Sequence, residues 1–462
     1  MRLLLFAVLN HARFPSCAPF ALVIPYAAMN RAAETPAPST LPEPVFPARW
    51  RILGLLVLLS AGQQLQRIGL PAAGKEIMRE YGLDEVAMGG LYSVFLYTYT
   101  LMMTPGGLLA DKIGTWGSLL IVMVGSSLCG ALTGTVGWLA TSAVGAWWWI
   151  AMARGSMGVL AAPLYPSTSR TVANWFPRRE RVLANSFVTG AALVGIVGAY
   201  LCMDALNSKV GWRSAFLLLG AVTGAITVLW VVAGSTGPWG RGTAPRTNAA
   251  KVGPRRWGWL AFFRHPGILF LTLSYGTVGY FEYLFFYWLD YYLKEVLKLE
   301  SVSLGYTLAP YLTMMVFTPL GGIVCAWIVR RWGFRGGLRG MAMGAMALGA
   351  LCLALGALAG DFDRKILWFS LGLGFIGASE GPFWTMAVHL GGPYGGASGG
   401  FVNTGGNLVG LLAPIATPWI AKVVNGSAWG LAAADPAIGW TVALIVGSLI
   451  TLAGVLSWLW VD

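Results

Sequence analysis

Runs of about twenty apolar residues recur along this 462-residue chain and constrain its fold more than any other feature. A helix of that length spans the hydrocarbon core of a bilayer, whereas transmembrane barrels use alternating segments of about ten residues. Twelve such runs lie near 51–73, 86–109, 116–137, 143–168, 182–206, 212–234, 266–293, 303–329, 338–359, 366–390, 398–422 and 437–460. We therefore predict an all-α polytopic membrane protein with twelve transmembrane helices.

The composition agrees with a chain surrounded by lipid. Hydrophobic residues make up 56% of the sequence and charged residues only 11%. A soluble domain carries about 25% charged residues, because its surface faces water. This balance excludes a soluble enzyme, a coiled coil, a collagen and a disordered protein.

The widest gap between runs, residues 235–265, divides the twelve spans into six and six. It holds six basic residues together with Gly and Pro, and we interpret it as a cytoplasmic basic linker. We expect one six-helix bundle over residues 49–234 and a second over 266–462. Residues 1–48 are expected to be a disordered leader, in which Met29 is the true start and 1–28 an extension of the reading frame.

The positive charges predict the orientation of the chain. With the N-terminus inside, the internal loops hold fifteen Lys and Arg residues and the N-terminal segment five, against nine in the external loops. The positive-inside rule then places both termini in the cytoplasm. The net charge of +13 is a topology signal and indicates no nucleic-acid partner. We expect a monomer in the plasma (inner) membrane.

The five cysteines and three histidines show no metal-ligand spacing, and four of the cysteines lie inside apolar runs. No nucleotide-binding loop and no Ser/His/Asp constellation is visible. We therefore expect no metal, no cofactor and no enzymatic activity.

A weak internal repeat supports the division into two halves. The segment from Gly106 to Asp111 aligns with the segment from Gly321 to Ala326, and Asn185–Gly198 aligns with Asn403–Gly410. Glycines at such spacing let helices approach closely.

The segment Gly107-Leu-Leu-Ala-Asp111-Lys112-Ile-Gly114 resembles the loop 2–3 motif of the major facilitator superfamily. The resemblance implies two pseudo-symmetric six-helix bundles and transport by alternating access. It also implies that Gly107, Asp111, Lys112 and Gly114 form a gating motif, in which the acid holds the outward-open state through contacts between helices.

Further motifs resemble the anion:cation symporter family, which carries sugar acids and other organic anions. They are Arg67, Pro105-Gly106-Gly107, Arg154-x3-Gly158, Ala162-Pro163-x-x-Pro166, Trp175-Phe176-Pro177-x-x-Glu180-Arg181, Trp288-Leu289-x-x-Tyr292-Leu293 and Asn403-x3-Asn407. Four positions depart from the family pattern. Gln66 and Ala161 replace the acids expected in proton-coupled members, Asp290 replaces a proline, and Ala326 replaces the acid of the second loop motif.

Arg67 and Arg154 are the basic residues that fall deepest in the predicted spans. A charge at a helix centre costs about 2.5–3.5 kcal/mol, so it persists with a partner or in a wet cavity. Arg67 shares a helix face with Gln63 and Gln66, and it either clamps a substrate carboxylate or forms a structural ion pair. Arg154 is either a second anion contact or gating residue, or the buried partner of an acid in the other half.

Two acids, Glu282 and Glu380, fall in predicted spans of the second half. Glu282 lies in an aromatic setting with Tyr275 seven residues before it on the same helix face. An apolar setting favours protonation of a carboxylate, so Glu282 either exchanges a proton or permanently neutralises an arginine. Glu380 precedes Gly381-Pro382, which we expect to break the helix and line a cavity. Both acids are candidate ion-coupling residues.

Substrate hydroxyls require polar side chains at a similar depth. The candidates are Gln66, Tyr92, Tyr97, Tyr99, Asn403 and Asn407, of which the family resemblance favours Asn403. Tyrosines in such a stripe are otherwise ordinary packing residues.

The leading hypothesis is a secondary transporter of a small organic anion, coupled to H⁺ as the family resemblance implies. Gln66 and Ala161 leave open a facilitator, an exchanger or a sodium-coupled carrier. A neutral or cationic solute requires that both deep arginines be ion-paired internally. A membrane-bound enzyme or a non-transporting sensor is the alternative from another class.

Overall fold

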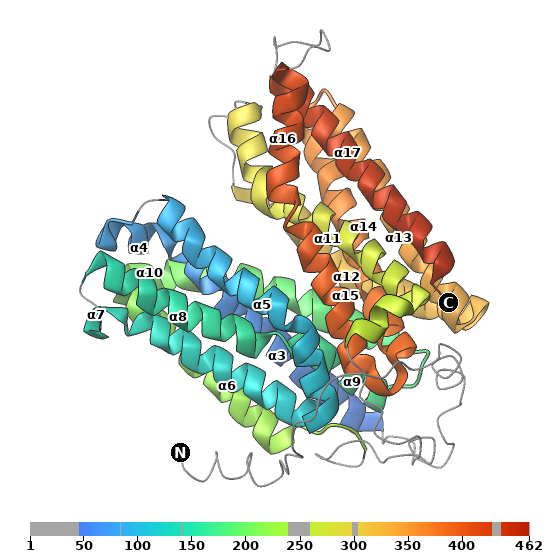
Figure 1. Ribbon diagram of the computed structural model, residues 1–462, viewed down its shortest axis with the longest axis horizontal. Helices are drawn as coiled ribbons and strands as arrows, with labels where there is room; N and C mark the ends of the chain where they lie inside the picture. The colour runs from blue at the N-terminus through green and yellow to red at the C-terminus, as the bar shows by residue number, and fades with distance from the viewer. Residues whose placement is uncertain are drawn as a thin grey trace.

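The computed structural model describes residues 46–83, 85–139, 142–238, 259–297, 304–426 and 436–461. Every regular element in those ranges is a helix, and the helices form two bundles that cross at an angle (Figure 1). Most of the predicted leader and residues 239–258 of the predicted linker lie outside the described residues.

The first bundle corresponds to predicted spans one to six. Its helices are α3 (Phe46–Ala72), α4 (Gly74–Tyr81), α5 (Glu85–Ile113), α6 (Thr115–Gly134), α7 (Val136–Leu139), α8 (Ala143–Ala161), α9 (Leu164–Trp175) and α10 (Arg181–Ala233). The short helix α4 between the first two spans was not predicted. It is amphipathic, because Ile77 is fully buried while Arg79 and Glu80 on its other side are exposed.

The second bundle follows the short helix η2 (Trp259–Arg264) and corresponds to predicted spans seven to twelve. Its helices are α11 (Pro266–Tyr291), η3 (Tyr292–Val296), α12 (Leu304–Trp332), α13 (Phe334–Leu358), α14 (Phe362–Gly391), η4 (Gly392–Tyr394), α15 (Gly395–Gly410), α16 (Ala413–Gly426), α17 (Pro436–Ser457) and η5 (Trp458–Trp460).

Within the described ranges, eight helical stretches are long and apolar enough to cross a membrane. The remaining predicted spans correspond to α3, α5, the pair α8 and α9, and α14. In α3 the polar patch from Gln63 to Arg67 interrupts the apolar run, and α14 carries charges in its first turn and at Glu380. The predicted all-α polytopic fold is confirmed.

Helix breaks follow glycine and proline only in part. Gly211, with φ +77°, separates the two predicted spans that merge in α10, because a positive φ favours glycine. Pro163 lies between α8 and α9. The predicted break at Gly381-Pro382 is wrong: α14 continues through Pro382. A proline inside a membrane helix is tolerated where neighbouring helices pack around it, and here α10 contacts α14 closely beside Gly381.

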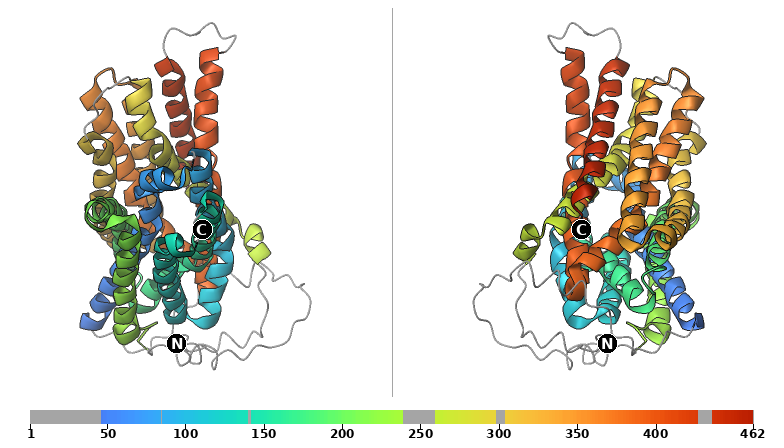
Figure 2. Two further views of the ribbon diagram at one scale, coloured as in Figure 1. Left: turned by 90° about the vertical axis from the view of Figure 1, so that its left-hand side faces the viewer. Right: turned by 90° about the vertical axis from the view of Figure 1, so that its right-hand side faces the viewer.

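The two bundles meet at one end of the molecule and separate towards the other. α5 packs against α15, α10 packs against α12, and α9 contacts α14 and α15. We call the end where Asp111 meets Gly396 the closed end. The opposite end, towards α4 and the start of α17, is the open end, where the bundles diverge (Figures 1 and 2).

Candidate functional site

Arg67 extends from α3 and is partly buried at the interface of the two bundles. Its guanidinium carbon lies 5.2 Å from the centroid of the Phe95 ring and 5.4 Å from that of Tyr99, both on α5. The two rings stack with their centroids 5.5 Å apart. A cation over an aromatic face gains about 0.5–2 kcal/mol. The rings therefore orient the guanidinium without neutralising its charge.

Helix α11 brings Glu282 and Tyr283 of the second bundle towards Arg67. Tyr283 interacts with the guanidinium and donates a hydrogen bond from its hydroxyl to Oδ1 of Asn407 at 2.7 Å. Glu282 is partly buried, and its carboxylate interacts electrostatically with Glu380 and with Arg67. The ion pairs within 4 Å in the described part of the chain include neither residue. The cation and the carboxylate are thus neighbours that are not bonded to each other.

Asn403 and Asn407 lie one turn apart on α15, as their spacing predicts. Nδ2 of Asn407 donates to the backbone oxygen of Asn403 at 3.0 Å and to its Oδ1 at 3.2 Å. Asn403 is buried beside the hydroxyl of Tyr99, and its Nδ2 has no hydrogen-bond partner. We call Arg67, Tyr99, Glu282, Tyr283, Asn403 and Asn407 the Arg67 cluster.

Glu380 of α14 is buried inside the second bundle and does not belong to the Arg67 cluster. Its Oε2 accepts hydrogen bonds from the hydroxyl of Tyr275 and from Nε1 of Trp384, each at 3.0 Å, while Oε1 has no partner. Trp384 contacts Tyr165 of the first bundle, with ring centroids 5.4 Å apart. Tyr275, expected on the face of Glu282, therefore bonds the other acid.

Gln66 and Arg154 point away from the Arg67 cluster and into the first bundle. Nε2 of Gln66 donates to Oγ1 of Thr223 at 2.9 Å. Arg154 is 1% exposed, donates from Nη1 to the backbone oxygen of Gln66 at 2.8 Å, and lies 5.0 Å from the Phe216 ring centroid. It forms no ion pair with an acid of the second bundle within the described residues. In this conformation both residues fix the backbone of α3 next to Arg67.

Tyr92 and Tyr97 also lie apart from the Arg67 cluster. The hydroxyl of Tyr92 packs against Gly74 of α4, towards the open end, and Tyr97 is 60% exposed. Of the three tyrosines predicted from α5, only Tyr99 reaches Arg67.

The residues of the predicted gating motif lie at the closed end. Oδ1 and Oδ2 of Asp111 accept hydrogen bonds from the backbone nitrogens of Gly396 and Ala397, at 3.0 and 2.8 Å, at the start of α15. Arg170 of α9 lies 3.4 Å from the same carboxylate and donates to the backbone oxygen of Gly392. A carboxylate at a helix N-terminus is favourable, because the backbone N–H groups there lack intrahelical partners. Asp111 thus joins the two bundles.

The other motif residues lie around this contact. Lys112 is exposed, and Gly114 has φ +85° where α5 turns into α6. Gly107 packs directly against the backbone of Gly396 and Ala397, so a side chain there would overlap α15.

Replacing Gly107 with valine is expected to slow transport by about 10- to 100-fold, because overpacking costs about 1–3 kcal/mol and opposes the closed end. The measurement is substrate counterflow in proteoliposomes. Gly344→Val is the matched control, since nothing lies within 4 Å of a Cβ at that helical glycine. Equal rates for both variants would contradict the close contact.

The sequence interpretation missed Phe95, Tyr165, Tyr283 and Trp384. Each is an aromatic residue in a helix that holds further aromatic residues, so residue type alone did not distinguish it from packing. A signal existed for Tyr283, because Tyr283 and Tyr287 lie one turn apart beside Glu282.

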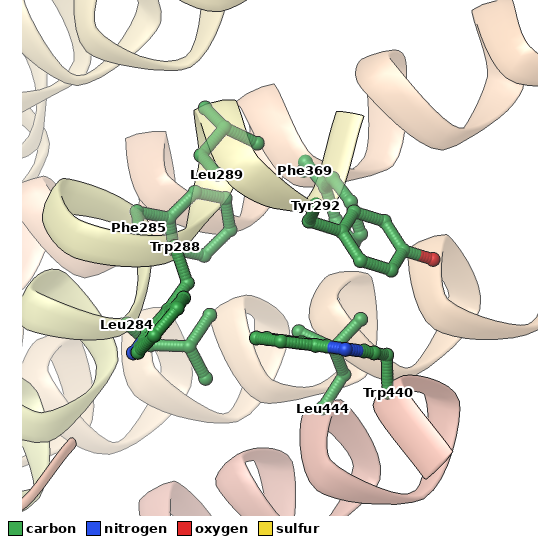
Figure 3. A pocket seen from close by; sticks show the side chains of 8 residues that line it. All are labelled: Leu284, Phe285, Trp288, Leu289, Tyr292, Phe369, Trp440 and Leu444. Carbon is green, nitrogen blue, oxygen red and sulfur yellow. The ribbon is translucent and has the colours of Figure 1, made fainter. Parts of the chain in front are cut away.

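A separate pocket inside the second bundle is not a substrate site. Leu284, Phe285, Trp288, Leu289, Tyr292, Phe369, Trp440 and Leu444 line it (Figure 3). Its volume is about 10 Å³, which is at the lower limit for a single water molecule. It is a small apolar packing gap.

Comparisons with known proteins agree with this architecture. Residues 56–414 match the family model of the Major Facilitator Superfamily. The chain is 25% identical over 380 residues to the probable sulfoacetate transporter SauU of Cupriavidus necator, covering 79% of this chain and 86% of that protein. It is 24% identical over 439 residues to the D-galactonate transporter of Escherichia coli, covering 89% and 96%. The predicted resemblance to sugar-acid and organic-anion transporters is confirmed.

Solved structures show the same fold. The Escherichia coli fucose:proton symporter FucP matches with a TM-score of 0.63 and 12% identity, covering 90% of this chain and 99% of that one. FucP in the outward conformation matches with a TM-score of 0.62 and 13% identity over the same shares. The family is one of transporters and not of enzymes, as predicted. The chain belongs to the major facilitator superfamily.

Proposed function

We propose that this protein is a secondary transporter that carries a small, hydroxylated organic anion together with H⁺ by alternating access. The observation that carries the proposal is the guanidinium of Arg67, which lies at the bundle interface over two aromatic rings and has no carboxylate within 4 Å in the described residues. A partly buried cation without a carboxylate partner favours an anionic ligand. Its planar fork binds a carboxylate or sulfonate with two parallel hydrogen bonds.

The asparagines supply contacts for hydroxyl groups. Asn403 has an amide nitrogen without a partner, and Asn407 and Tyr283 already hold each other in place. An amide both donates and accepts, so it recognises a hydroxyl whichever way the hydroxyl hydrogen points. The relatives named for galactonate and sulfoacetate transport support an anionic substrate.

Glu282 is the proposed coupling group. When it is ionised, its carboxylate competes with the substrate for the charge of Arg67, and when it is protonated, Arg67 is free for the substrate. Proton and anion then bind cooperatively, because each raises the affinity for the other by the same factor. Arg67 and Glu282 belong to different bundles, so the rocking of one bundle against the other changes their separation.

The orientation follows from the charges at the closed end. Arg170 lies beside Asp111 there, Arg179 and Arg330 line one space between the start of α10 and the end of α12, and Arg178 and Arg331 are their neighbours in the chain. We propose on the positive-inside rule that this end is cytoplasmic and that both termini lie inside. We propose the plasma membrane as the location. The conformation is then outward-open, and Asp111 holds the cytoplasmic side shut.

Counterflow in proteoliposomes tests the substrate class. Vesicles loaded with unlabelled galactonate are expected to accumulate labelled galactonate. External glucarate and sulfoacetate, which each carry a second acid group, are expected to compete less strongly than external galactonate, and the neutral sugar fucose is not expected to compete. Competition by fucose together with failure of every anion would overturn the anion assignment.

A further inference from the structure

A cavity of about 370 Å³ lies between the two bundles at the closed end, away from the Arg67 cluster. The start of α3, the start of α10 and the last turns of α12 form it. Its lining consists of Trp50, Arg179, Glu180, Leu183, Ile323, Ala326 and Arg330. Its volume falls in the range of small-molecule sites, about 300–1,000 Å³, so it has room for more than a few water molecules.

The charge of the cavity is positive. Glu180 lies 3.1 Å from Arg49, and this ion pair is neutral overall. Arg179 and Arg330 are exposed, and no carboxylate pairs with either within the described residues. The first turn of α10 has no side-chain cap, and its N-terminus adds a partial positive charge. Two arginines and a helix N-terminus therefore surround one space.

The internal repeat shows that the second half lacks the acidic side chain that the first half has at the corresponding position. Asp111 at the end of α5 places its carboxylate on the start of α15, and Ala326 occupies the corresponding position of α12, which packs against α10. In the first half the chain supplies the negative group that joins the bundles. In the second half a methyl group stands in its place, and a cavity remains beside it.

The lining also has an apolar side that continues along the bundle surface. Leu320, Ile323, Val324 and Trp327 are 47–62% exposed and share one face of α12, and Trp50 lies at the start of α3. An exposed apolar stripe that ends at two cations matches a lipid, whose acyl chain follows the stripe and whose headgroup reaches the arginines. A soluble anion has no acyl chain that could contact this apolar stripe.

We propose that this cavity binds the phosphate headgroup of an anionic phospholipid from the inner leaflet, held by Arg179 and Arg330. The phosphate takes the place that a carboxylate at position 326 would fill. The inference does not depend on the identity of the transported substrate.

Native mass spectrometry of the purified protein with phosphatidylglycerol tests the site. We expect one tightly bound phosphatidylglycerol in the wild type and about tenfold weaker binding in the double variant Arg179→Gln/Arg330→Gln. Ala326→Asp is expected to weaken binding similarly, because it places a negative charge inside the cavity. Wild-type affinity in both variants would overturn the proposal.

Two controls identify the ligand and the residues. Arg331→Gln removes an exposed arginine next to Arg330 that does not line the cavity, and it should leave binding unchanged. Zwitterionic phosphatidylcholine should not replace phosphatidylglycerol. An equal loss in Arg331→Gln would show a general charge effect, and displacement of the lipid by inorganic phosphate at matched concentration would assign the cavity to a soluble anion. Either result would overturn the lipid site.

Discussion

Replacing Arg67 with alanine is expected to lower the affinity for a carboxylate substrate by about 100-fold. A hydrogen bond to a charged group contributes about 1.5–3 kcal/mol, and the bidentate pair loses both bonds. A loss of about 3 kcal/mol corresponds to about two factors of ten in affinity. Substrate binding to purified protein, measured by calorimetry, gives the value directly.

The intermediate variant separates charge from geometry. Arg67→Lys keeps the positive charge but loses the planar fork, so we expect about a tenfold loss. Arg51→Gln on the same helix is the matched control, because Arg51 is exposed near the closed end. Unchanged affinity in Arg67→Ala, with the wild-type melting temperature, would disprove the clamp.

Replacing Glu282 with glutamine is expected to abolish accumulation driven by a pH gradient while leaving counterflow within about threefold of the wild type. Glutamine preserves the size of the side chain but neither takes up nor releases a proton. The inward pH gradient then cannot drive accumulation, because the variant has no group at this position that binds and releases a proton. The substrate still exchanges across the membrane. Labelled uptake into proteoliposomes, with and without a gradient, measures both properties.

Glu380→Gln is the comparison for that experiment. Glu380 is 6% exposed and already accepts two hydrogen bonds, so we expect its variant to lose thermal stability while it retains gradient-driven uptake. Loss of coupling in Glu380→Gln and its retention in Glu282→Gln would move the coupling role to Glu380.

The sequence predicted the architecture well, because a bilayer imposes the length and polarity of every span. Positions that depend on one helix were predicted only in part: Asn403 and Asn407 share a face, whereas Gln66, expected on the face of Arg67, points into its own bundle. Sequence spacing carries no information about which helices meet. For that reason Arg154 was a candidate partner of Glu282, although it bonds the backbone of Gln66 in its own bundle.

The prediction that proline breaks the helix was wrong for the same reason, because it considered one helix without its neighbours. Gly381-Pro382 weakens an isolated helix, but packing against α10 keeps α14 continuous. The aromatic residues in contact with Arg67 also come from two different helices, α5 and α11, and only their arrangement in space distinguishes Tyr99 and Tyr283 from the many other tyrosines.

The burial of Arg154 away from Arg67 has a consequence for how membrane voltage acts on the protein. It leaves the Arg67 cluster with a single cation, so a second carboxylate on a substrate would have no positive partner there, and we predict a preference for singly charged anions. One such anion travelling with one proton carries no net charge. Moving a charge across the membrane costs about 2.3 kcal/mol per 100 mV, and that contribution vanishes for a neutral pair. The proposed cycle is therefore electroneutral: the pH gradient drives it and the electrical potential does not.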